Sequence, residues 1–99
     1  SKVGSYTGTG AALNIDCGFT SGARFVLIKR TDAGGQWLVF DSVRGIVSGN
    51  DPFLRLNSDG AEETAYDIID PLSSGFSLTS NNDWETNISG GSYIFYAIA

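Results

Sequence analysis

The chain has 99 residues, a length typical of one domain, and 41% of them are hydrophobic and can form a core. Charged residues make up only 17%, and the net charge of −5 is uneven: residues 1–56 hold six basic and four acidic side chains, whereas residues 57–99 hold seven acidic side chains and no Lys or Arg. The sequence thus lacks the clustered cations that nucleic-acid binding requires and any apolar run long enough to span a bilayer, so we expect no nucleic-acid partner and no membrane insertion.

Apolar and polar residues alternate in the first half of the chain, which is the pattern of half-buried β-strands. Residues 25–28 are apolar on both faces, which is typical of a strand in the interior of a sheet. Residues 31–35 contain Asp and Gly and predict a hairpin loop to the next strand. The predicted strands of this half are residues 3–7, 12–17, 25–28, 37–40 and 53–56.

In the second half, the predicted strands are residues 64–69, 75–79 and 92–99. We expect the first of them to end at the Asp70-Pro71 pair, because Pro lacks a backbone N–H. The last strand is apolar on both faces and would aggregate as an exposed edge, so we expect it inside a sheet or against a partner. No helix longer than one turn is expected, and the best candidate for that turn is residues 61–64.

About eight short strands with turn signals at near-regular spacing indicate an all-β fold. We predict one domain over residues 1–99, an antiparallel β-sandwich that is jelly-roll-like or lectin-like in outline.

A series of short motifs runs in a fixed order through most of the chain from Phe19 onward. The motifs are FVLIKR (residues 25–30), Trp37, FDSVRG (residues 40–45), LRLNS (residues 54–58), GFSL (residues 75–78) and GSYIFYA (residues 91–97). This order resembles a pattern found among tail fibres and other virion-surface proteins of tailed bacteriophages.

The resemblance implies a lectin-like sandwich without a defined active site. It implies a virion structural domain of a tail fibre or surface appendage, involved in assembly and host attachment and located at the surface of the phage particle. The implied partners are other copies of the virion protein, as a homotrimer, and a host-surface glycan. Because the chain begins with Ser1 and not with Met, we expect it to be a piece of a longer virion protein.

Asp41, Arg44 and Gly45 predict a structural corner where a strand ends. A carboxylate three residues before an arginine can accept backbone N–H bonds from the turn and also pair with the guanidinium. Gly45 then lets the backbone turn away.

Trp84 is the large aromatic residue in a polar loop with Asn81, Asn82 and Asp83. We predict these four residues as contacts for a glycan or a protein partner, and the alternative role of Trp84 is a loop anchor packed on the sandwich. Two other functions remain open: a carbohydrate-binding module and a capsid decoration protein.

Catalysis by a Ser or Cys nucleophile needs a base, and the chain has no His. The single cysteine, Cys17, is expected to be a buried or half-buried strand residue. Paired carboxylates could hydrolyse a glycosidic bond, but such pairs arise by chance in an acidic chain, so we expect no enzyme. The candidate pairs are Asp67 with Asp70, Glu62 with Glu63, and Asp83 with Glu85.

We expect no resident cofactor, and the alternative is a calcium ion near Asp59 and Glu62. Carboxylate-rich loops provide the oxygen ligands that this hard cation prefers.

Overall fold

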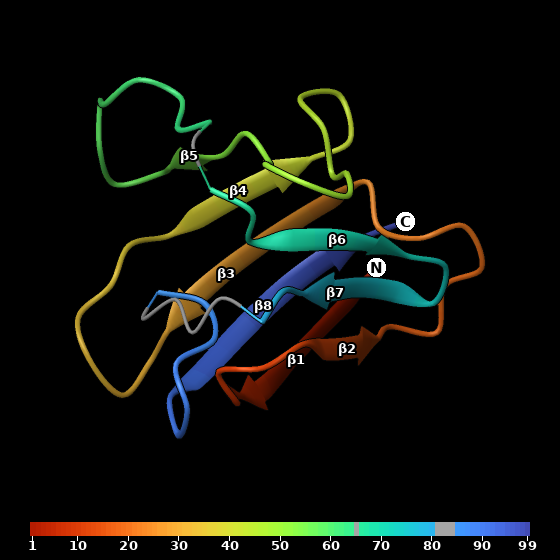
Figure 1. The fold of residues 1–99 in the computed structure, drawn as a ribbon, viewed down its shortest axis with the longest axis horizontal. Helices are drawn as coiled ribbons and strands as arrows, with labels where there is room; N and C mark the ends of the chain where they lie inside the picture. Colours follow the sequence, from red (N-terminus) through yellow and green to blue (C-terminus); the bar gives the residue numbers. More distant parts are fainter. Residues whose placement is uncertain (65, 81–84) are drawn as a thin grey trace.

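The computed structural model describes residues 1–64, 66–80 and 85–99, which form eight β-strands in two antiparallel sheets (Figure 1). The predicted all-β antiparallel sandwich is therefore confirmed. The strands are β1 (Lys2–Thr7), β2 (Leu13–Asp16), β3 (Phe25–Arg30), β4 (Leu38–Asp41), β5 (Leu54–Arg55), β6 (Ile69–Leu72), β7 (Gly75–Leu78) and β8 (Ser92–Ile98).

The large sheet has the strand order β1-β8-β3-β4-β5. Its first and last strands in sequence pair with each other, with Lys2 opposite Ala97, so the two ends of the chain lie close together (Figure 1). β8 is hydrogen-bonded to β1 on one side and to β3 on the other, which confirms its predicted place inside a sheet. The predicted pairing across the loop at residues 31–35 is also present, as β3 with β4.

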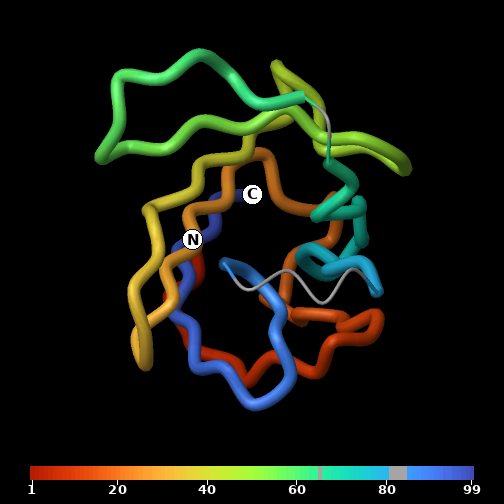
Figure 2. Tube along the Cα trace, turned by 60° about the vertical axis from the view of Figure 1, so that its left-hand side comes forward, coloured from red at the N-terminus to blue at the C-terminus, as the bar shows by residue number. Residues whose placement is uncertain are grey.

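The small sheet has the order β2-β7-β6 and packs against one face of the large sheet; Figure 2 shows the two layers side by side. Alternate residues of both sheets point into the space between them. The ring of Phe76 from β7 meets the ring of Phe95 from β8 edge-on, with centroids 5.4 Å apart. The core includes Ile15, Val26, Ile28, Leu38, Phe40, Phe53, Ile69, Phe76, Leu78, Tyr93, Phe95 and Ala97.

The predicted strand over residues 64–69 is wrong in position. The observed strand β6 starts at Ile69 and includes Asp70 and Pro71, which the prediction places after the strand. β6 is an edge strand that pairs only with β7, so one of its sides needs no backbone donors and a residue without N–H is tolerated there.

Within the described residues no helix occurs, so the single turn considered for residues 61–64 is not formed. The same residues contain no helix with the length and apolar character needed to cross a membrane.

Candidate functional site

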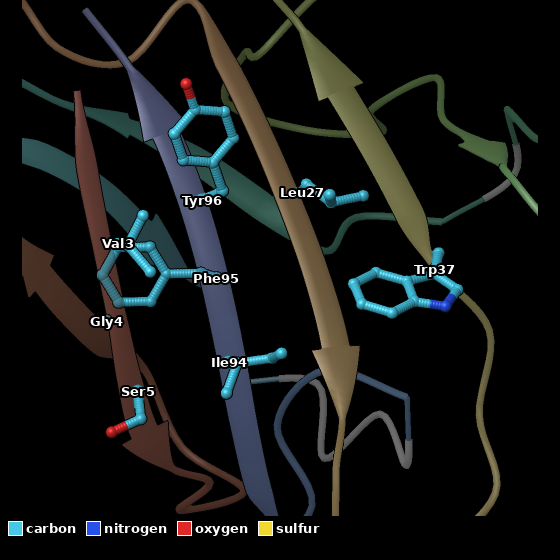
Figure 3. A pocket seen from close by; sticks show the side chains of 8 residues that line it. All are labelled: Val3, Gly4, Ser5, Leu27, Trp37, Ile94, Phe95 and Tyr96. Atoms are coloured by element: carbon cyan, nitrogen blue, oxygen red, sulfur yellow. The ribbon is translucent and has the colours of Figure 1, made fainter.

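The outer face of the large sheet points away from the small sheet and carries large apolar side chains in solvent. Val3 is 71% exposed, Ile94 40%, and Tyr96 and Trp37 38% each. In Figure 3 these side chains stand together with Leu27 on the side of the sheet opposite β2, β6 and β7. We call these five residues the apolar patch: Val3, Leu27, Trp37, Ile94 and Tyr96.

Strand register brings the apolar patch together. Val3, Tyr96 and Leu27 are direct neighbours across β1, β8 and β3, and because successive residues of a strand point to opposite faces, all three side chains share the outer face. Ile94 lies two residues before Tyr96 on β8, with Ser5 and Lys29 as its neighbours.

Backbone hydrogen bonds fix the position of Trp37 directly before the start of β4. Its N–H donates to Oδ1 of Asn57 (3.2 Å), and its carbonyl accepts the N–H of Leu56 (2.9 Å). The indole therefore reaches the outer face beside Leu27 (Figure 3). An open hollow of about 330 Å³ lies between the indole and β1 and is lined by the apolar patch, Gly4, Ser5 and Phe95.

The outer face is a candidate functional feature that sequence analysis did not assign as a whole, although it expected the last strand inside a sheet or against a partner. The signal that could have found it is the last strand, whose residues are apolar on both faces. Its inward residues Tyr93, Phe95 and Ala97 are buried in the core, whereas Ile94 and Tyr96 on the other side remain exposed.

Asp41, Arg44 and Gly45 lie together at the end of β4. Oδ1 of Asp41 accepts the backbone N–H of Arg44 (2.7 Å), and its other oxygen pairs with the Arg44 guanidinium. These contacts, the backbone N–H first, lower the pKa of Asp41. Gly45 donates its N–H to the Asp41 carbonyl (2.9 Å) and has a φ of 132°, a backbone conformation that favours glycine.

Arg44 also contacts the loop that contains Asp59 and Glu62, the residues for which a calcium ion is considered. Nε of Arg44 lies 3.0 Å from Oε1 of Glu62, so this carboxylate already has a cationic partner. Asp59 is exposed in the same loop. Calcium near Asp59 and Glu62 stays a prediction, and binding there would compete with the Arg44 guanidinium.

A different set of carboxylates comes together beside β6. Oxygen atoms of Asp51, Asp67 and Asp70 lie within 4.8 Å of one another, which unites the predicted Asp67–Asp70 pair with a residue from a distant turn. Burial and the nearby Asp67 carboxylate raise the pKa of Asp70.

Asp51 is fully buried, and its hydrogen bonds give it a structural role. It accepts the backbone N–H groups of Val47 (2.9 Å), Ile68 (3.3 Å) and Ile69 (3.0 Å). These bonds fasten the turn before β5 to the start of β6. Burial raises the pKa of Asp51, and the three N–H groups oppose that shift.

The four predicted contact residues, Asn81, Asn82, Asp83 and Trp84, lie outside the described residues, and so does the Asp83–Glu85 pair through its first member. The chain directly after them is firmly attached. The buried Asn87 side chain accepts the N–H of Thr9 (2.9 Å) and donates to the carbonyls of Ala11 (2.8 Å) and Thr79 (3.1 Å).

Cys17 is buried, in agreement with the prediction, but it follows the end of β2 at Asp16 and is not a strand residue. Burial raises the pKa of its thiol. A raised pKa keeps the sulfur protonated and poorly nucleophilic at neutral pH.

Comparison with known proteins gives a family and no function. No curated protein and no solved structure matches the chain. A family model described as a domain of unknown function (DUF7483) matches residues 1–99, which is the whole chain. The chain therefore belongs to the DUF7483 family.

Proposed function

We propose that this domain is a non-enzymatic structural part of a tailed-phage virion, located in a tail fibre or another surface appendage. Its work is to pack against other virion protein copies and to hold loops toward the host surface. The phage context comes from the ordered motifs between Phe19 and Ala97, which resemble virion-surface proteins and imply a homotrimer.

The observation that carries the assembly role is the exposed apolar patch on the outer face of the large sheet. A domain that works alone gains nothing from a Val, an Ile, a Tyr and a Trp in solvent on one sheet face, whereas a domain that works packed against others covers them. The low fraction of charged residues, 17%, fits the same role.

Electron microscopy with gold-labelled antibodies against this domain tests the proposal. Phage particles from a lysate that contains the chain are expected to carry label on the tail or its fibres. Label spread over the capsid would instead support a capsid decoration protein. Particles without label would contradict a virion role, as would bond-breaking turnover of a polysaccharide by the purified domain.

A carbohydrate-binding module is the second candidate, favoured by the exposed rings of Trp37 and Tyr96 on one face. Flat aromatic rings can stack on the apolar faces of sugars. A glycan array with the wild type, Trp37→Ala and Trp84→Ala tests it: binding that one substitution abolishes supports this function and locates the site. Absence of binding at high protein density contradicts it.

A further inference from the structure

We propose that the outer face of the large sheet is a contact surface for the same face of a second copy of this chain, related by a two-fold axis. The inference rests on the proposed function and names the partner that covers the apolar patch. The resemblance implies three copies, whereas the geometry of this face points to a pair. The mass of the assembly from sedimentation equilibrium distinguishes a trimer from a dimer.

The first support is the chemistry of the face. The outward positions of β1, β8, β3 and β4 include Val3, Ile94, Tyr96 and Leu27, with Trp37 at the start of β4. Each is apolar or aromatic, and aromatic residues are enriched at protein interfaces. Burying them against a similar face would release the water that now covers them.

The second support is the size of the face. The five strands of the large sheet are two to seven residues long, and at about 4.8 Å between strands and about 3.3 Å per residue they make a face of roughly 400 Å². Two such faces in contact bury on the order of 800 Å², an area found in weak and transient interfaces. We therefore expect association with a Kd in the micromolar range and not a permanent complex.

The third support is the position of the charges. Among the outward positions of β1, β8, β3 and β4 the charged residues are Lys29 and Asp41. Asp41 pairs with Phe25 at the beginning of β3, whereas Lys29 lies near the other end of β3, so the two charges are at opposite ends of the face.

A two-fold axis parallel to the sheets and perpendicular to the strands turns one end of the face onto the other. Lys29 of each copy then lies at the Asp41 end of its partner. The two-fold axis repeats every contact, so the interface contains two Lys29–Asp41 contacts. Asp41, Arg44 and Glu62 together keep one net negative charge, so attraction remains after the internal ion pairs are counted. The face is therefore complementary to itself in charge.

Sedimentation equilibrium from about 1 μM to about 500 μM tests this surface. The wild type is expected to change from monomer to dimer across this range. Ile94→Lys puts an ammonium group into the apolar patch directly beside Lys29 and is expected to weaken dimerisation at least about tenfold. Because this substitution makes the net charge less negative, general repulsion between copies cannot explain a loss.

Val43→Lys is the matched control, since Val43 is 96% exposed in the turn after β4 and the substitution changes the net charge equally. It is expected to dimerise like the wild type. Ser5→Lys repeats the test from β1 with the same change of net charge and without removing an apolar side chain, and covers the case in which Ile94→Lys fails to fold by circular dichroism.

A wild type that stays monomeric overturns the contact surface but not the virion role, because antibody labelling of particles does not depend on it. A trimer overturns the pair. The proposed pair is also overturned by a dimer that both Ile94→Lys and Ser5→Lys leave intact, or by glycan binding at this face with no self-association. Self-association of the domain without antibody label on phage particles would support the contact surface and contradict the proposed function.

Discussion

Asp51 is the residue on which the long connection between β4 and β6 depends. Its buried carboxylate accepts hydrogen bonds from three backbone N–H groups, and two of the donor residues, Ile68 and Ile69, are themselves buried. Asp51→Ala leaves these donors without a partner, which we expect to lower the free energy of unfolding by roughly 2–4 kcal/mol in urea denaturation.

Asp59→Ala is the control for that measurement, because Asp59 is exposed in a loop. It should change the free energy of unfolding by no more than about 0.5 kcal/mol. Equal effects of the two substitutions would show that the Asp51 hydrogen bonds do not hold the fold together.

Two carboxylates, Asp70 and Asp32, make the stability of the fold depend on pH in opposite directions. The pKa of Asp70 is raised above its ordinary value of 3.8, so its contribution is most favourable below that value and declines as the pH rises through the folded-state pKa. The pKa of Asp32 is lowered to about 2, chiefly by its hydrogen bond with Arg30, so its contribution is present above pH 3.8 and is lost as the pH falls toward 2.

Urea denaturation of Asp70→Asn and Asp32→Asn across pH 2–7 separates these effects. Relative to the wild type, Asp70→Asn should gain stability as the pH rises above about 4, because it removes an unfavourable ionisation. Asp32→Asn should lose stability relative to the wild type as the pH rises from about 2 to about 4, because it removes a favourable ionisation. Parallel curves for the wild type and either variant would contradict the corresponding assignment.

At the scale of the strands, β7 packs so closely on β2 that only glycine fits at its first position. A Cβ atom on Gly75 would lie 2.1 Å from the carbonyl oxygen of Ile15. Since the Cβ atom is fixed to the β7 backbone and the oxygen belongs to the backbone of the paired strand β2, Gly75→Ala must separate β7 from β2, and we expect it to destabilise the domain by roughly 3 kcal/mol or more.

Gly34→Ala gives the comparison, because nothing lies within 4 Å of a Cβ atom at this position in the loop between β3 and β4. Its melting temperature should equal or slightly exceed that of the wild type, through reduced entropy of the unfolded chain. Similar melting temperatures for the two variants would mean that β2 and β7 are not packed as closely as described.

Strand patterns in the sequence predict most elements because the signals are local. The two-sided apolarity of residues 25–28 and 92–99 correctly places both strands inside one sheet. The strand over residues 64–69 fails because its position is set by tertiary contacts. The Asp51 carboxylate holds the N–H groups of Ile68 and Ile69, and Pro71 is accepted only because β6 is at an edge.

The same distinction applies to the candidate sites. Asp41, Arg44 and Gly45 can be recognised together because they lie within five residues. The apolar patch cannot, because it joins Val3, Leu27, Trp37 and Ile94 through strand register, and register is not readable from one sequence. The cluster of Asp51 with Asp67 and Asp70 likewise exists only after folding.

At the scale of the whole molecule, the two sheets use their faces differently. The inner faces enclose the core, in which Tyr93, Phe40 and Phe76 are completely buried. The outer face of the large sheet adds a second apolar layer that the single domain leaves in solvent. The exposed apolar patch is therefore the main structural argument for the proposed assembly of copies, whereas the proposed virion role is tested separately by antibody labelling of particles.

Hydroxyl-radical footprinting at low and high protein concentration tests this claim most directly. If the outer face is covered by a second copy, oxidation of Tyr96 and Trp37 should fall several-fold between about 1 μM and about 500 μM. Tyr66, which is 48% exposed and lies outside the apolar patch, should be oxidised equally at both concentrations. Constant oxidation of Tyr96 and Trp37, or protection of Tyr66 instead, would contradict the account.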